Sequence, residues 1–137
     1  MEGPLSWAYS IGFPETVGAP ELICFAPALG AARLLADARE YLSDGRLKLR
    51  DGAIWDALGF PLCFRPVHES QMMGFQWMRL AKEHAEAQAG RRVDVEAYQL
   101  FLPDNEGRYP WEEGCLPGVK DMQPLLFNPL DLPNQPI

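Results

Sequence analysis

The chain has 137 residues, of which 47% are hydrophobic and 23% are charged, a composition typical of globular domains that excludes wholesale disorder. Twelve lysines and arginines against 19 aspartates and glutamates give a formal net charge of −7, which argues against binding to nucleic acid or an anionic membrane. We expect a single domain over residues 1–137, with an ordered core at about 6–127 and a loose tail at 128–137.

The sequence also bears on the cellular compartment. No basic segment followed by an apolar run opens the chain, so no signal peptide is predicted. The longest weakly polar run, 22–32, is too short to span a bilayer. The three cysteines, Cys24, Cys63 and Cys115, are odd in number and form no C-x-x-C pair. We therefore expect a soluble, cytoplasmic protein with no disulfide framework, no metal and no cofactor.

The first third of the chain predicts two strands and a helix. Large and small side chains alternate over 6–13, which indicates a half-buried strand. Residues 14–20 indicate a turn, and 21–26 is a nearly all-apolar strand that would pair antiparallel with the first. Residues 27–44 carry apolar side chains at helical spacing and precede Gly45, a favourable helix stop.

The middle of the chain repeats this alternation of strands and a helix. Strands are predicted at 53–58, 61–67 and 95–102. Ser70 is predicted to cap a second helix that runs to about residue 89 and ends at Gly90. The apolar stripe of this helix would consist of Met73, Trp77, Leu80, Ala81 and His84.

The last third of the chain differs from the rest in composition. Residues 103–107 (P-D-N-E-G) form a strong turn signal. Seven of the 13 prolines lie in the last 35 residues, and 94–137 hold eight acidic and two basic side chains, a net charge of −6. We expect an irregular, acidic, proline-rich wrap, pinned to the core by Leu125, Leu126 and Phe127.

Together these elements predict an α+β fold. The order of strands and helices, with short connections, favours an antiparallel or mixed sheet of about five strands. Two helices would cover one face of this sheet, and the proline-rich C-terminal segment would wrap around it.

Six segments carry a resemblance to a known family. They are W-A-Y-S-I-G-F at 7–13, P-E-L at 20–22, F-R-P-V at 64–67, Y-Q-L-F-L-P-D at 98–104, G-R-Y-P-W at 107–111 and Q-P-L-L at 123–126. Over about 6–127 the chain resembles the bacterial domain-of-unknown-function family 4262. The resemblance implies a small, soluble bacterial protein, and it supplies no activity, substrate or cofactor. Met72, Met73 and Met78 depart from what the family leads us to expect.

The most specific piece, 104–111, is also the first candidate binding site. Asp104, Arg108 and Trp111 would converge if the turn folds back. An arginine offers a planar fork for a carboxylate or phosphate, and a tryptophan offers a face for a ring or cation. The alternative is internal: Arg108 pairs with Asp104 or Glu106, and Trp111 clamps the loop to the core.

A second set of candidates lies on or beside the predicted strands. His68 follows a strand and precedes a helix, where it would serve as a general base or a ligand, or simply bond to backbone. Tyr9, Tyr98 and Gln99 would line a mixed pocket if they share a sheet face with His68 and Arg108. The alternative is that they are packed core residues.

Two functions remain open from the sequence. The first is a non-catalytic binding protein, of accessory, inhibitor or immunity-like type, that recognises a protein partner or a small-molecule ligand. The acidic composition of the chain suits a basic partner. The alternative is a small enzyme with a polar cleft built from His68, Asp104 and Arg108. Nucleic acid and membranes are not expected partners, and the oligomeric state is left open.

Overall fold

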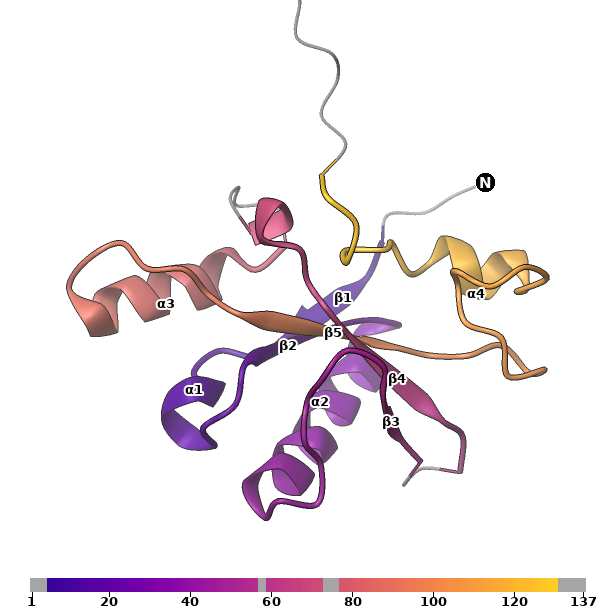
Figure 1. The fold of residues 1–137 in the computed structure, drawn as a ribbon, viewed down its shortest axis with the longest axis horizontal. Coiled ribbons are helices and arrows are strands. Elements are labelled where there is room, and N and C mark those ends of the chain that lie inside the picture. The colour runs from indigo at the N-terminus through magenta and orange to yellow at the C-terminus, as the bar shows by residue number, and fades with distance from the viewer. Residues whose placement is uncertain (1–4, 57–58, 73–76, 131–137) are drawn as a thin grey trace, which may run out of the picture.

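The computed structural model describes residues 5–56, 59–72 and 77–130, in which five strands form one mixed sheet (Figure 1). The strands are β1 (Trp7–Tyr9), β2 (Glu21–Phe25), β3 (Ala53–Trp55), β4 (Leu62–Pro66) and β5 (Ala97–Phe101). The helices are α1 (Phe13–Thr16), α2 (Ala28–Ser43), α3 (Arg79–Ala89) and α4 (Pro117–Asp121), with a 3-10 turn η1 at Glu69–Met72. The predicted α+β class with a mixed sheet is confirmed.

The strand order is β1-β2-β5-β4-β3. β1 pairs antiparallel with β2, as predicted, and β3, β4 and β5 also form antiparallel pairs. β2 and β5 are parallel, with Ile23 opposite Gln99. Since parallel strands start at the same edge of a sheet, the beginnings of β2 and β5 lie side by side. The backbone N–H of Glu21 donates to the carbonyl of Glu96 at 3.1 Å.

The expectation that both helices cover one face of the sheet is wrong. α2 packs on the face that carries Leu22 and Cys24, whereas α3 packs on the opposite face, with Ile23 and Phe25. Every residue of β2 is buried, so both faces of this strand need cover. In Figure 1, α2 accordingly lies below the sheet, and α3 and the C-terminal segment lie above it.

The N-terminal elements differ in length from the prediction. The strand expected over 6–13 spans only Trp7–Tyr9, and the expected turn contains the short helix α1. The chain leaves the strand direction at Gly12, which has φ +94°. Pro14 lies in the first turn of α1, where its missing N–H is not needed.

The predicted second helix also starts later than expected. The hydroxyl of Ser70 does not cap a helix, because it hydrogen-bonds to His68 Nδ1 (2.9 Å) and accepts the N–H of Leu130 (2.7 Å). α3 begins only at Arg79, and it ends at Gly90 as predicted, with φ +70°. Met73, which was assigned to the apolar stripe, lies outside the described residues.

The three later strands are present but shorter than predicted. β3 ends at Trp55, and residues 57 and 58 of the predicted strand lie outside the described residues. β4 ends at Pro66, whose ring nitrogen has no hydrogen to donate to a neighbouring strand. β5 covers the five central residues of its predicted range.

Two buried glutamine side chains attach the irregular C-terminal segment to the sheet. The fully buried Gln99 donates from Nε2 to the carbonyl of Pro124 (2.7 Å) and accepts the N–H of Leu126 at Oε1 (3.1 Å). The amide of Gln123 pairs with both the N–H and the carbonyl of Leu102, at 2.8 and 3.0 Å. Leu126 is buried, as expected of a residue that pins this segment to the core.

The expected loose tail is described only as far as residue 130. The carbonyl of Asn128 accepts a hydrogen bond from Gln71, and the N–H of Leu130 donates to Ser70. Residues 131–137 lie outside the described residues.

We predict that Gln99→Met lowers the free energy of unfolding by about 1–3 kcal/mol, because it leaves the buried N–H of Leu126 without an acceptor. Urea unfolding at neutral pH measures the change. The exposed Gln88→Met on α3 is the matched control, with an expected change below about 0.5 kcal/mol. Equal midpoints for wild type and Gln99→Met would show that the amide does not hold the C-terminal segment.

Candidate functional site

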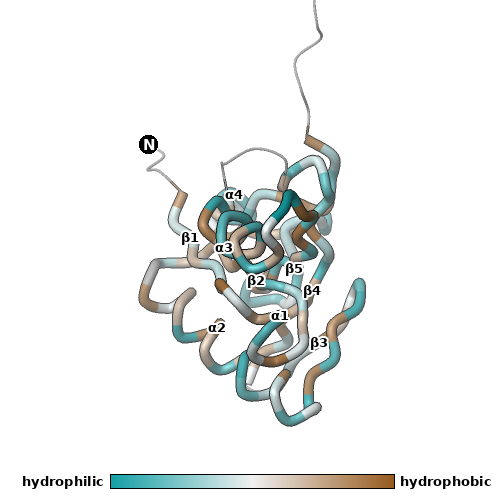
Figure 2. The backbone as a smooth tube through the Cα atoms, turned by 90° about the vertical axis from the view of Figure 1, so that its left-hand side faces the viewer, coloured by the Kyte–Doolittle hydropathy of each residue, from teal (hydrophilic) through white to brown (hydrophobic). Residues whose placement is uncertain are grey.

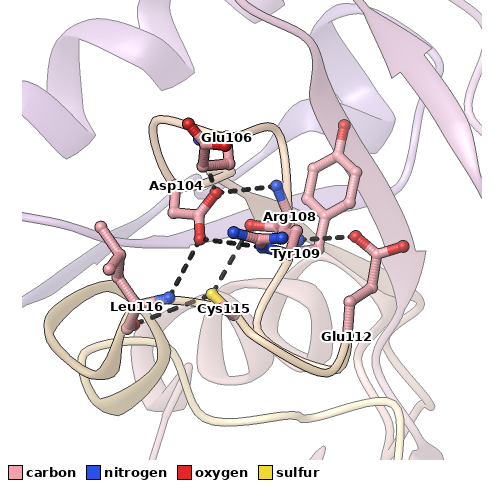
Figure 3. A network of polar contacts seen from close by, with 7 residues as sticks. All are labelled: Asp104, Glu106, Arg108, Tyr109, Glu112, Cys115 and Leu116. Atoms are coloured by element: carbon pink, nitrogen blue, oxygen red, sulfur yellow. Dashed lines mark hydrogen bonds and ion pairs between the residues drawn. The ribbon is translucent and has the colours of Figure 1, made fainter.

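Residues 104–111, the most specific segment of the family resemblance, fold around the carboxylate of Asp104, as Figure 3 shows. Its Oδ1 accepts the backbone N–H groups of Glu106 and Arg108, both at 2.9 Å, and its Oδ2 accepts that of Leu116 at 3.0 Å. The side chain is fully buried. Gly107, with φ +81°, donates to the carbonyl of Asp104 at 3.0 Å, so the predicted turn is present. Asp104 thus organises the whole loop from 104 to 116.

These hydrogen bonds also set the protonation of Asp104. The backbone N–H of Arg108 is the largest cause that lowers the pKa of this carboxyl. Burial acts in the opposite direction, and the N–H groups of Leu116 and Glu106 lower the pKa further, with a smaller contribution from the charge of Arg108. The carboxylate is therefore ionised near neutral pH, with its oxygens directed at the backbone.

Arg108 is held by the loop and only weakly paired with Asp104. Its Nε lies 3.8 Å from Asp104 Oδ2, and 43% of the side chain is exposed. The guanidinium lies against Gly114, where an added Cβ would approach Nε to 3.3 Å. Gly114 also has φ +89°, so a glycine is favoured there on both counts. This geometry fits the alternative in which Arg108 pairs with Asp104 inside the protein and does not bind a ligand.

Trp111 is committed to internal contacts. Its ring stacks on Tyr109 at 5.0 Å and meets the rings of Phe101 and Phe127 edge-on at 4.9 and 5.6 Å. The guanidinium of Arg65 lies 5.1 Å from its centroid. Trp111 therefore clamps the loop to the sheet.

Tyr109 completes the same cluster. Its hydroxyl donates to the carbonyl of Pro61 at 2.7 Å. Burial, together with the neighbouring Cys63, Glu112 and Asp56, raises the pKa of Tyr109 to about 12. Tyr109 thus ties the loop to the start of β4 as a neutral phenol.

The structure does not gather the strand candidates into one pocket. The hydroxyl of Tyr9 accepts the N–H of Leu80 at 3.2 Å, at the start of α3. Tyr98 lies on the face covered by α2, and burial raises the pKa of its phenol. Gln99 points to the opposite face, where it holds the C-terminal segment. These three residues thus contact three different parts of the protein.

His68 lies far from the loop of Asp104. The N–H of Val67 donates to the carbonyl of Ala97 at 2.9 Å, which places His68 near the start of β5. Asp104 follows the other end of β5, and the five residues of that strand span about 13 Å. His68 instead bonds to Ser70 through Nδ1. The polar cleft of His68, Asp104 and Arg108 is therefore not formed.

The arrangement of the metal-ligating and nucleophilic side chains gives no support to a metal site or a reactive thiol in the described residues. Residues 5–56, 59–72 and 77–130 contain no group of three or more His, Cys, Asp or Glu side chains able to hold a metal ion. Burial raises the pKa of the Cys24 thiol to about 12, and it is also the largest cause that raises the pKa of Cys63 and Cys115. The thiols are thus disfavoured as thiolate nucleophiles. In this described part of the chain no helix is long and apolar enough to cross a membrane.

A groove of about 590 Å³ lies at the other end of the molecule, between α1 and α3. In Figure 2, which turns this side toward the viewer, α3 lies above α1. Apolar and small residues form most of its lining, and they are Pro14, Gly18, Ala19, Pro20, Ala85, Ala89 and Val95. Four carboxylates and Gln88 complete the lining, and among the described residues no lysine or arginine contributes to it.

The four carboxylates of the groove have different surroundings. Glu21 is buried and bound to Ser10, Gly12 and Phe13, and Glu15 is hydrogen-bonded to Nε2 of His84. Asp94 and Glu96 are exposed and form no ion pair with any residue of the described ranges. The groove therefore joins an apolar floor to two carboxylates that are open to a cation.

Sequence reasoning did not single out the groove residues. Glu15, Asp94 and Glu96 are ordinary surface acids in sequence, and the short helix α1 was expected to be a turn. The parallel pairing of β2 with β5 brings them together. The one available signal was the excess of acidic residues after position 93, which was assigned to the C-terminal wrap as a whole.

Fold and loop together define an α+β domain in which a carboxylate-centred loop closes one end of a mixed sheet. The model of the family described as Domain of unknown function (DUF4262) matches residues 2–116, so the chain belongs to this family. The matched range includes the Asp104–Trp111 stretch and ends before the segment at 123–126. Comparisons with curated proteins and with solved structures each found no match.

We predict that Asp104→Asn destabilises the protein at neutral pH and that its difference from wild type shrinks in acid. The pKa of Asp104 is lower in the folded protein than its ordinary value of 3.8. Its contribution to stability is therefore complete above that ordinary value and is lost as the pH falls through the lowered pKa.

Urea midpoints measured from about pH 7 to about pH 2.5 test this prediction. Glu106→Gln is the control, because the exposed side chain of Glu106 accepts no hydrogen bond among the described residues. A gap between wild type and Asp104→Asn that stays constant over this range would contradict the assignment.

We also predict that the three thiols react slowly with 5,5′-dithiobis(2-nitrobenzoate) in the native protein near pH 8, since all three are buried and have raised pKa values. In urea all three should react rapidly. A thiol that reacts as fast in the native protein as in the unfolded chain would refute this description.

Proposed function

We propose that this protein is a non-catalytic binding protein and that its partner docks a basic segment in the groove between α1 and α3. The observation that carries the proposal is the apolar lining of the groove beside the carboxylates of Asp94 and Glu96, which form no ion pair within residues 5–56, 59–72 and 77–130. A docking site of this kind needs both parts, because burial supplies affinity and charge supplies orientation.

The chemistry of the groove favours a segment that alternates apolar and cationic side chains. The small floor residues Pro20, Ala85 and Ala89 leave room for the aliphatic stems of lysine or arginine. The charged ends of these side chains would then reach Asp94 and Glu96. The net charge of −7 adds long-range attraction for a basic partner and speeds its association.

The family-specific loop supports the non-catalytic part of the proposal. Both oxygens of Asp104 accept backbone N–H groups, and the ring of Trp111 is packed among other rings. His68, the candidate general base, lies beyond the far end of β5. These residues therefore act as scaffold in this proposal, and recognition falls to the groove.

The test uses a blocked peptide of alternating lysine and valine, about seven residues long, which spans about 20 Å when extended. We expect it to bind the wild-type protein at low salt. The double variant Asp94→Asn and Glu96→Gln should bind it about fivefold more weakly, at about 0.5 kcal/mol for each exposed charge. Fluorescence anisotropy measures both affinities.

The matched control removes the same charge elsewhere, through Glu113→Gln and Asp121→Asn, two exposed residues outside the groove. Its affinity should stay within about twofold of wild type, apart from a general loss of attraction that salt removes. Equal weakening by the two double variants would mean that only net charge matters, and the proposed site would be wrong.

A further inference from the structure

A second, smaller recess adjoins the groove and has the opposite charge. It measures about 420 Å³ and is lined by Lys82, Glu86, Arg91, Arg92, Val93 and Asp94. Three cations thus face two carboxylates, whereas the groove beside it has four carboxylates and no lysine or arginine. The recess is thus locally basic, although the chain as a whole has a formal net charge of −7.

The cations of the recess are available for a ligand. Lys82, Arg91 and Arg92 form no ion pair with any other residue that the structure describes. One of the two carboxylates is engaged, because Glu86 Oε2 accepts the N–H of Val93 at 3.4 Å. The guanidinium of Arg91 donates to the carbonyl of Arg92 at 3.3 Å. A carboxylate that entered the recess would therefore meet three cations that form no ion pair within the described residues.

The recess and the groove are continuous along α3. Asp94 lines both of them. α3 contributes Lys82 and Glu86 to the recess and Ala85 and Ala89 to the groove, so two adjacent rows of side chains on one helix line the recess and the groove. Figure 2 looks onto this side of the molecule, with α3 above α1. A single extended segment that lies in the groove would reach the recess by passing Asp94.

We infer that the docked partner segment carries an acidic group directly beside its basic residues, with the basic part in the groove and the acidic group in the recess. This inference rests on the proposed function of the groove. The inference requires a partner whose basic and acidic residues follow one another in a defined order. A segment bound in the reverse orientation would place its acidic group beside the carboxylates of the groove and its basic residues beside the cations of the recess.

The experiment compares three blocked peptides of equal length. One joins alternating lysine and valine to a neutral glycine–serine end, and the other two carry an aspartate-rich end, one at the C-terminus and one at the N-terminus. We expect one of the two mixed-charge peptides to bind wild type about fivefold more tightly than the neutral-ended peptide, although its net charge is less positive.

The double variant Arg91→Gln and Arg92→Gln should abolish this gain and leave the affinity for the neutral-ended peptide undiminished. Arg39→Gln with Arg50→Gln, two exposed arginines outside both hollows, is the matched control and should keep the gain. Urea midpoints confirm that each variant folds.

The outcomes separate this inference from the function on which it rests. If no mixed-charge peptide gains affinity, or if the gain survives in the Arg91 and Arg92 variant, the inference is wrong and the groove proposal stands. If the neutral-ended peptide itself fails to bind wild type, the groove proposal is wrong and the inference falls with it.

Discussion

The groove between α1 and α3 depends on one buried carboxylate, that of Glu21 at the first position of β2. Its Oε1 accepts the hydroxyl of Ser10 (2.6 Å) and the N–H of Phe13 (3.1 Å), and its Oε2 accepts the N–H of Gly12 (2.7 Å). These bonds fix the start of α1 to the sheet. The backbone N–H of the same residue donates to the carbonyl of Glu96 and so fixes the opposite wall. A buried carboxylate is costly unless it is well paired, and here its partners are the backbone that shapes the groove.

Asp104 has a corresponding role at the other end of the sheet, where it gathers three backbone N–H groups into one loop. The most specific part of the family-like sequence is thus explained by folding. Arg108 lies against Gly114, and Trp111 fills the space between Tyr109 and Phe101. The motif of aspartate, arginine and tryptophan is compatible with a structural role, because the oxygens of Asp104 accept backbone N–H groups and the ring of Trp111 packs against other rings of the protein.

The sequence predicts those features that depend on neighbouring residues. The apolar spacing before Gly45 predicts α2, and Gly90 marks the end of α3, because helix faces and caps are local. It does not reveal that β2 and β5 are parallel, since strand direction depends on the whole topology. The antiparallel pairing of β4 with β5 places His68 and Asp104 at opposite ends of β5, and the parallel pairing of β2 with β5 makes Glu21 and Glu96 meet. The use of opposite sheet faces by α2 and α3, and hence the groove between α1 and α3, is likewise a property of the whole fold.

The most direct test of the account is an NMR titration of the isotope-labelled protein with the lysine–valine peptide, because it locates binding without a variant. The account predicts that amide shifts change over 14–21, 85–89 and 94–96, the segments that line the groove. Changes centred on the loop of Asp104, Arg108 and Trp111, with the groove amides unmoved, would contradict it.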